Sequence, residues 1–168
     1  MQNTQFRFAT RQDTSLILDF IKELAEYEKE PDAVEATIEI LEESIFEKQQ
    51  AKVVLLEEDG QSVGFALYFF NFSTWRGKAG LYLEDLFVRP QYRGKGYGKI
   101  LLSYLANQAV EQGCPRFEWI VLDWNKPSID FYKAMGAKPL DEWTVFRLEN
   151  EKLQTLAKIY RTSCGLEG

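Results

Sequence analysis

The sequence predicts an α/β fold, a single domain in which a central mixed β-sheet carries helices on both faces. Runs of alternating apolar residues and runs at helical spacing follow one another in the order β-α-α-β-β-β-α-β-α-β-α. From about residue 80 to 122, a strand, a glycine-rich loop, a helix and a further strand form a βαβ unit, which predicts local parallel pairing. The 168 residues suit one domain over 1–168, with a core over about 5–148.

The first half of the chain is expected to hold two helices and four strands. Apolar residues at helical spacing predict one helix from Asp13 to about Glu28 and a second, amphipathic helix after Pro31. Alternation predicts strands over 5–9, 51–57, 62–72 and 80–88. The last three should form an antiparallel meander, with Gly60 in the turn between the first two of them.

The second half is expected to alternate helices with strands. We predict helices over about 97–112, 127–135 and 150–161, and strands over 116–122 and 143–148. Gly113 and Gly136 are suited to ending helices, and Pro127 is suited to the first helical position.

The composition argues against several classes of function. The chain has no histidine, which removes Ser-His-Asp and Cys-His catalysis and histidine-based metal sites. A net charge of −6 disfavours a nucleic-acid partner and an anionic membrane surface, and no segment has the roughly 18 apolar residues of a membrane span. Cys114 and Cys164 form no CxxC motif, and the N-terminus has no apolar signal segment. We therefore expect a cytoplasmic protein without a bound metal.

A glycine-rich loop between a predicted strand and a predicted helix is the most informative motif. Glycines at 94, 96 and 98 allow close approach of a ligand, and the amides of a helix N-terminus suit a pyrophosphate. Arg93, Lys95 and Lys99 add positive charge. The other interpretation is a flexible turn with solvated cations. The loop matches neither the Walker pattern nor the Rossmann fingerprint.

The pattern Arg93-x-x-Gly96-x-Gly98 matches the (Q/R)xxGx(G/A) signature, and the chain resembles the Gcn5-related N-acetyltransferase (GNAT) superfamily over about residues 5–148. The resemblance implies the GNAT acyl-CoA N-acyltransferase fold, with acetyl-CoA as cosubstrate. It also implies an oxyanion donor among the amides near Phe87 or Val88, where a bulge splays the strand in this family. The implied cofactor-binding residues are Phe87, Val88, Arg93, Gly94, Lys95, Gly96, Tyr97, Gly98, Lys99, Asn125 and Ser128.

Several longer blocks are similar to the diamine acetyltransferases, the group with spermidine/spermine and thialysine members. They are IKELAEYEK, STWRGK, LYLEDLFV, YRGKGYG, VLDWN and FYKAMGA, and the STW, VLDWN and YKAMGA segments are more similar to the thialysine member. This closer resemblance implies direct acetyl transfer to a small primary amine in a ternary complex. It also implies a homodimer.

The same resemblance assigns the acid and the base. Tyr132 matches the tyrosine that protonates the leaving thiolate, and a phenol with a pKa of about 10 is a neutral donor at pH 7. Glu84 matches the residue that accepts the proton of the amine through water. Because side chains alternate along a strand, Glu84 and Asp85 should point to opposite faces, and Asp85 is interpreted as structural. A core tyrosine and a structural glutamate are the other interpretations of Tyr132 and Glu84.

Substrate-side positions are carried over in the same way. Tyr27, Glu28, Trp75 and Glu118 join Glu84 as the implied substrate-binding residues, since an aromatic face beside carboxylates suits an ammonium group. Trp75 is equally well read as a surface aromatic, Glu28 as part of a charged helix end, and Ser128 as an ordinary helix N-terminal residue.

Two departures bear on the substrate. Ser73 stands where the spermidine/spermine enzymes have an acidic residue, which weakens the case for a long polyamine. The loop over 138–143 is shorter than in the animal enzymes, which leaves contacts near Glu142 in doubt. The alternatives at this point are acetylation of protein lysine, a non-catalytic acyl-CoA-binding module and a nucleotide-phosphate-binding regulator.

Overall fold

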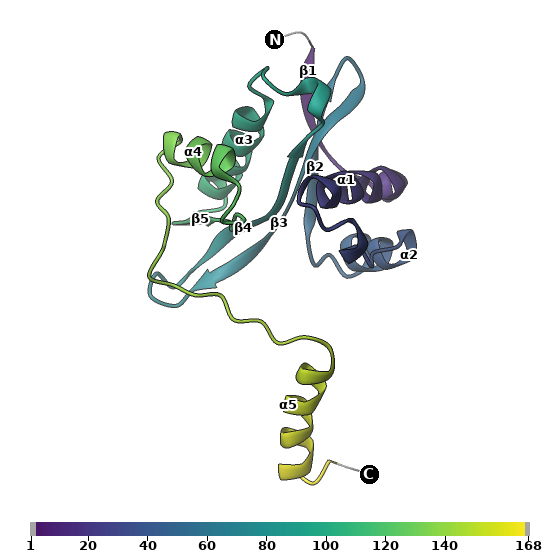
Figure 1. Ribbon diagram of the computed structural model, residues 1–168, viewed down its shortest axis with the longest axis vertical. Helices are drawn as coiled ribbons and strands as arrows, with labels where there is room; N and C mark the ends of the chain where they lie inside the picture. Colours follow the sequence, from purple (N-terminus) through teal and green to yellow (C-terminus); the bar gives the residue numbers. More distant parts are fainter. Residues whose placement is uncertain (1–2, 167–168) are drawn as a thin grey trace. The chain divides into compact units, whose positions relative to one another are not determined.

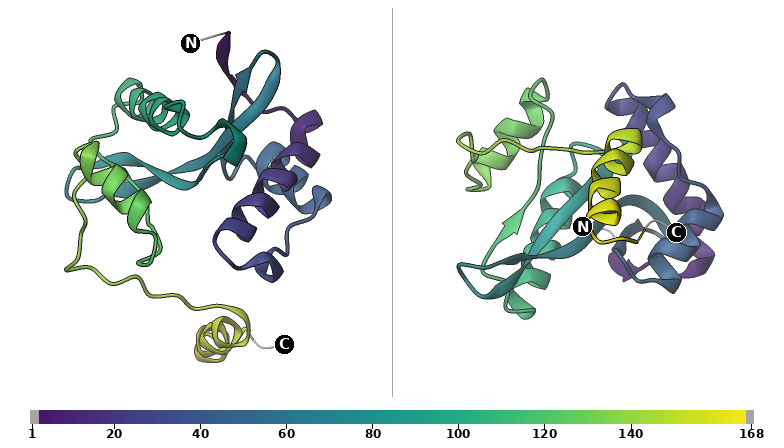
Figure 2. Two further views of the ribbon diagram at one scale, coloured as in Figure 1. Left: turned by 45° about the horizontal axis from the view of Figure 1, so that its top comes forward. Right: turned by 90° about the horizontal axis from the view of Figure 1, so that it is seen from below.

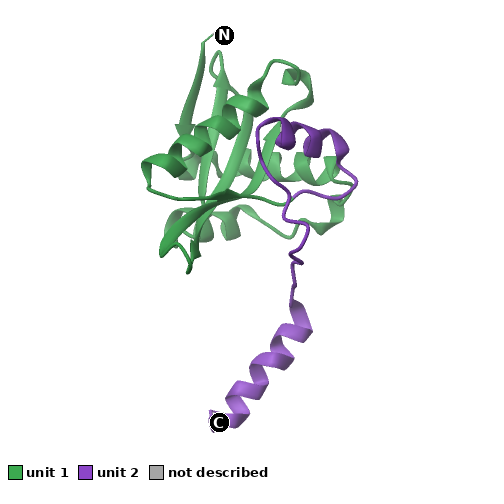
Figure 3. Ribbon diagram, turned by 90° about the vertical axis from the view of Figure 1, so that its left-hand side faces the viewer, with its two compact units in different colours: residues 1–120 green, residues 121–168 purple. Residues whose placement is uncertain are grey.

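The computed structural model describes residues 3–166 and divides the chain into two compact units, residues 1–120 and 121–168 (Figure 3). The first unit holds the sheet, the glycine loop and the three N-terminal helices of the fold. The second unit holds two helices and the segment that connects them.

The sheet of the first unit has five strands in the spatial order β1-β2-β3-β4-β5 (Figure 1). Their bounds are Thr4–Phe8, Lys52–Glu58, Gln61–Ser73, Lys78–Val88 and Phe117–Glu118. The first four pair antiparallel and β5 pairs parallel with β4, as the meander and the βαβ unit predicted. The predicted mixed sheet is therefore confirmed.

Helices cover both faces of this sheet (Figures 1 and 2). Helix α1, Thr14–Tyr27, and helix α2, Ile38–Leu41, lie on one side, and helix α3, Tyr97–Glu111, lies on the other. Helix α2 continues as a π-helical stretch, Glu42–Glu47, so the second predicted helix is regular for only one turn. The side of the sheet that α1 covers is called the α1 face below.

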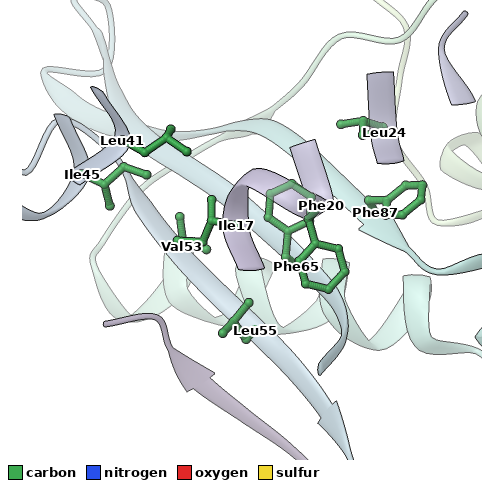
Figure 4. Close-up of a cluster of buried hydrophobic side chains, with 9 residues drawn as sticks. All are labelled: Ile17, Phe20, Leu24, Leu41, Ile45, Val53, Leu55, Phe65 and Phe87. Atoms are coloured by element: carbon green, nitrogen blue, oxygen red, sulfur yellow. The ribbon is translucent and has the colours of Figure 1, made fainter. Parts of the chain in front are cut away.

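The core under α1 explains why its apolar residues recur at helical spacing. Ile17, Phe20 and Leu24 point from α1 onto the sheet, where the ring of Phe20 stacks on Phe65 at 5.0 Å between centroids (Figure 4). Phe20 and Phe65 are fully buried, and burying a phenylalanine side chain contributes about 1.5–3 kcal/mol. This packing fixes the position of the last turn of α1, which carries Tyr27 and Glu28.

A β-bulge lies in the middle of β4. Leu67 of β3 pairs with Asp85, whereas the next residue, Tyr68, pairs with Leu83, so Glu84 is an extra residue with no partner in the register. The bulge expected near Phe87 and Val88 is not there, because both of these residues pair in regular register with β3. A bulged residue interrupts the alternation of faces, and this one places Asp85 on the α1 face with Phe87.

The second unit contains helix α4, Lys126–Ala134, and helix α5, Asn150–Ser163. Two strand predictions from residue 116 onward were wrong. The strand over 116–122 is reduced to the two residues of β5, and 143–148 is not a strand. Alternation supplies only the side-chain pattern, whereas a strand also needs a hydrogen-bonded neighbour, and within the described part of the second unit there is none. No helix within residues 3–166 has the length and apolar character needed to cross a bilayer.

Candidate active site

The glycine loop leaves an open, amide-rich surface at the start of α3. Gly94 and Gly96 have φ of 79° and 82°, which favours glycine, and a Cβ added at either one would meet no atom within 4 Å. Gly96 is the N-cap of α3, and among the described residues no side chain caps this helix. The first-turn amides of α3 therefore face outward, where an anion suits both their N–H groups and the helix dipole.

Arg93 does not extend from the loop toward an anion, as its assignment as a loop cation had implied. Its Nε donates to the carbonyl oxygen of Val88 at 3.0 Å, and its guanidinium carbon lies 4.9 Å from the ring centre of Tyr27 and 5.3 Å from that of Phe87. Arg93 thus joins the glycine loop to the end of α1. A cation between two rings is a stabilising arrangement, so Tyr27 is engaged by the protein itself.

Lys95 and Tyr97 are both held by Glu58, at the end of β2. Nζ of Lys95 lies 3.1 Å from Oε1 of Glu58, and the buried Tyr97 hydroxyl makes a short hydrogen bond to the same oxygen. This bond raises the pKa of Tyr97 to about 12, and the bonds from Tyr97 and Lys95 lower the pKa of Glu58. Tyr97 therefore holds the loop against the end of β2. Lys99, two residues further along α3, is an exposed cation.

Acidic side chains gather on the α1 face beside the bulge. Partial burial, Glu84 and Glu28 together raise the pKa of Asp85 to about 7, and burial and Glu84 raise the pKa of Glu28. Burial, Glu84 and Glu118 also raise the pKa of Tyr82. Glu84 thus acts on Glu28 and Asp85, and Glu84 and Glu118 both act on Tyr82. These four carboxylates are called the acidic cluster below: Glu28, Glu84, Asp85 and Glu118.

Within the acidic cluster, Asp85 has the most perturbed titration, although sequence reasoning had treated it as structural. Glu84 is exposed at the bulge, whereas Asp85 is partly buried. A carboxyl group with a pKa near 7 is suited to accepting and releasing protons at neutral pH. Two adjacent acidic residues inside an apolar strand were the sequence signal for this site. The bulge that decides which face of the sheet each side chain points to left no signal in the sequence.

Glu118 lies on β5 opposite Tyr82 and has a cationic neighbour. Nε of Arg116 lies 2.5 Å from Oε1 of Glu118. Sequence reasoning missed Arg116, which precedes the strand by one residue and belongs to no motif.

Trp75 is not brought to the acidic cluster. It lies in the turn between β3 and β4 and is 95% exposed, about 20 Å along β4 from the bulge if each residue rises about 3.3 Å. Ser73, which begins this turn, is buried and its Oγ accepts a hydrogen bond from the amide of Arg76. The interpretation of Trp75 as a surface aromatic fits the fold of the first unit better.

The remaining predicted residues belong to the second unit. Asn125 is buried at the N-cap of α4, where its Oδ1 accepts a hydrogen bond from the backbone amide of Ser128 at 3.4 Å. Tyr132 lies in the middle of α4, and its ring is 5.5 Å from that of Phe131. Within residues 3–166, no group of three or more Cys, Asp or Glu side chains is placed to bind a metal ion.

Known proteins resemble this chain in sequence and in fold. The chain is 40% identical over 169 residues to the thialysine N-epsilon-acetyltransferase of Sus scrofa, covering 94% of this chain and 99% of that protein. It is 48% identical over 96 residues to an L-ornithine N5-acetyltransferase of Arabidopsis thaliana, covering 57% of this chain and 42% of that protein. An integron cassette protein of V. cholerae has a similar structure, with a TM-score of 0.79, 29% identity and coverage of 94% and 99% of the two chains.

The sequence profile of one family matches residues 17–137, a range that includes α1, the bulged strand, the glycine loop and α4. This match covers more than half of the chain, and the thialysine N-epsilon-acetyltransferase of Sus scrofa matches over nearly all of it. The chain therefore belongs to the acetyltransferase (GNAT) family.

Proposed function

We propose that this acetyltransferase moves the acetyl group of acetyl-CoA onto the primary amine of a small molecule, as the names of its relatives suggest. The observation that carries the proposal is the position of two features on β4: the acidic cluster at its bulge and the open glycine loop after its end. The cluster suits a cationic amine, and the loop suits the pyrophosphate of the cosubstrate.

The residues present fit acetyl-CoA. The amides from Gly94 to Gly98 would hold the pyrophosphate, with Lys95 and Lys99 nearby, while Asn125 and Ser128 would contact the cosubstrate from α4. An amide of Phe87 or Val88 would donate to the oxyanion. In support, β5 pairs with β4 only at Leu81 and Tyr82, so within the first unit the rest of that β4 edge has no strand beside it.

The chemical step needs one proton acceptor and one proton donor. The ammonium group of the substrate loses a proton to the pair Glu84 and Asp85, with exposed Glu84 receiving it first through water. The nitrogen lone pair then attacks the acetyl carbonyl carbon, the carbon–sulfur bond breaks and the thiolate takes a proton from Tyr132. The nitrogen loses its surplus proton, which returns through water to the Tyr132 phenolate, and the products are the amide and the thiol. Because Glu84 helps to raise the pKa of Asp85, we treat the two carboxyl groups as one base.

The test is a CoA-release assay with acetyl-CoA and a panel of amines: thialysine, lysine, ornithine, spermidine, spermine, putrescine and a lysine-containing peptide. Turnover of a small amine supports the proposal. Turnover of the peptide alone would instead favour acetylation of protein lysine. Tight acetyl-CoA binding without turnover of any amine would favour a non-catalytic binding module.

Glu58 gives a prediction about the glycine loop. Replacing Glu58 with glutamine removes the charge that holds Lys95 and Tyr97, so we expect the KM for acetyl-CoA to rise about 10-fold while the KM for the amine stays within about twofold, since a charged hydrogen bond contributes about 1.5–3 kcal/mol. Initial-rate kinetics with each substrate varied in turn measure both constants.

The matched control is Glu57→Gln, at the preceding residue of β2. Glu57 is a buried carboxylate that pairs with Arg7 of β1 at 2.6 Å and does not contact the loop. Its loss should lower stability and leave the KM for acetyl-CoA unchanged. Equal effects of the two substitutions on this constant would contradict a specific role for Glu58.

We further propose a cytoplasmic homodimer in which residues 1–168 act as one acetyltransferase domain. The family match runs across residue 120, which supports treating both units as one functional domain. Light scattering of the purified protein tests the dimer, and a monomer mass would reject it.

A further inference from the structure

Two arginines that follow β4, Arg89 and Arg93, contact α1 at different points. Nε and Nη2 of Arg89 donate to the Glu23 carboxylate at 3.0–3.2 Å, and its guanidinium carbon lies 4.5 Å from the ring centre of Phe20. Glu23 directly precedes Leu24, the last buried residue of α1. The Arg89 contact therefore belongs to the part of α1 that the hydrophobic core already holds.

Arg93 contacts α1 one turn later, at Tyr27. Its guanidinium lies 4.9 Å from the ring centre of Tyr27 and 5.3 Å from that of Phe87. Phe87 is 4% exposed and meets Phe20 edge to face in the core, whereas Tyr27 is 37% exposed. Arg93 thus connects a ring that the core fixes to an exposed ring at the end of α1.

The backbone of Arg93 belongs to the cosubstrate side of the site. Its Nε bond to the carbonyl oxygen of Val88 spans the turn after β4, and the glycine loop over 94–98 follows directly. A ligand that orders the amides of this loop therefore also fixes the backbone that carries Arg93. Lys95, in the same loop, instead contacts Glu58 on β2.

The end of α1 belongs to the amine side of the site. Tyr27 directly precedes Glu28, a half-buried member of the acidic cluster. Burial and the charge of Glu84 raise the pKa of Glu28, so these two carboxyl groups, one from α1 and one from β4, are neighbours. A contact that fixes Tyr27 also restricts Glu28, because the two residues are adjacent in one helical turn.

We propose that Arg93 is a positioning residue that couples the two substrates: when acetyl-CoA orders the glycine loop, Arg93 holds Tyr27 and thereby fixes Glu28 for the amine. This inference rests on the proposed acetyltransferase function. Because ordering the loop also orders the end of α1, the second substrate binds to a site that the first has already ordered. Coupling between two sites is reciprocal, so the amine tightens the binding of the cosubstrate by the same factor.

The experiment measures this coupling factor as a ratio of two Kd values. CoA replaces acetyl-CoA, because it has the same pyrophosphate and cannot acetylate the amine. Calorimetry gives the Kd of CoA alone and with a saturating amine, either thialysine or the member of the panel with the highest kcat/KM. For the wild-type protein, we expect the amine to lower the Kd of CoA about 10-fold.

In Arg93→Gln, the coupling factor should fall to about threefold or less, as expected for loss of a cation–π contact and a charged hydrogen bond. The remainder reflects direct attraction between anionic CoA and the cationic amine. Lys95→Gln is the matched control, because it removes the same charge from the same loop and leaves the contact of Arg93 with Tyr27 in place. It should weaken CoA binding with and without the amine and keep the factor within about twofold of the wild-type value.

Tyr27→Leu should lower the coupling factor as Arg93→Gln does, and the double variant should lower it no further, since the two residues form one contact. A partly unfolded sample has fewer binding sites but the same Kd, so loss of folding does not produce this result.

A wild-type factor of one, an Arg93→Gln protein that keeps the wild-type factor, or a double variant with a further loss overturns the inference while the acetyltransferase function stands. Turnover of no amine in the CoA-release assay would instead reject the function itself.

Discussion

Replacing Tyr132 with phenylalanine is expected to lower kcat about 10²- to 10⁴-fold, the usual range for removal of a general acid. The phenol of Tyr132 is proposed to protonate the thiolate as the carbon–sulfur bond breaks, and phenylalanine keeps the ring without the proton. Because the step follows binding, the KM values for acetyl-CoA and the amine should stay within about twofold. Steady-state kinetics with the best amine of the panel measure these constants.

Tyr160→Phe is the matched control, since Tyr160 is an exposed tyrosine of α5 and its hydroxyl has no proposed role. Thermal unfolding should show both variants to be folded. A Tyr132→Phe protein with at least half of the wild-type kcat would reject the assignment of Tyr132 as the acid, whereas a raised KM at unchanged kcat would make it a binding residue.

Replacing Asp85 with asparagine is expected to raise the free energy of unfolding at pH 8 and to lower the rate of acetyl transfer. The carboxyl group has a pKa of about 7 in the folded protein against an ordinary value of 3.8. Ionising it in the fold therefore costs up to about 4 kcal/mol, at about 1.4 kcal/mol per pKa unit. We expect a gain of about 2–4 kcal/mol, since asparagine carries no charge.

The sign of the pH dependence follows from the raised pKa. Between about pH 3.8 and pH 7 the folded protein binds more protons at Asp85 than the unfolded chain, so this contribution to stability is complete below pH 3.8 and is lost as the pH rises through 7. Urea unfolding should show the gain of the variant at pH 8 and little of it at pH 4. Asp19→Asn, at an exposed site of α1, should show no such difference.

The same substitution tests the proton acceptor. In the Asp85→Asn protein, Glu84 no longer has the neighbouring carboxyl group of Asp85 beside it, so the acidic limb of the pH–rate profile should move down by more than one pH unit. Glu84→Gln should remove the acceptor that meets the substrate. An acidic limb that stays in place in both variants would exclude this pair as the base.

The sheet and its helices were predictable because each depends on patterns within a few residues. Helix α1 follows from apolar residues at helical spacing, and β2, β3 and β4 follow from alternation between turns. The segment over 143–148 has the same alternation and no ladder, because pairing depends on a neighbour that the local pattern does not specify.

The candidate site also contains residues that local patterns predict and residues that depend on distant contacts. The glycine loop was predictable because its glycines are needed locally for positive φ and an open surface. Glu58 and Arg116 were not, because each contacts residues of another element that only the fold brings close. Asp85 was visible as a residue, but its direction could not be predicted, since it depends on where β4 departs from regular pairing with β3.

The extra residue in β4 also determines how this chain should be compared with others. Deleting Glu84 would leave Leu83 opposite Tyr68 and Asp85 opposite Leu67, so the ladder would become regular and every other residue of β4 would keep its face. A one-residue insertion or deletion that no bulge absorbs would instead exchange the two faces along the rest of the strand. In a sequence alignment, a gap at position 84 therefore removes one carboxylate without changing the faces of β4, and homologues that lack this residue should keep the strand and lack the exposed acid at its bulge.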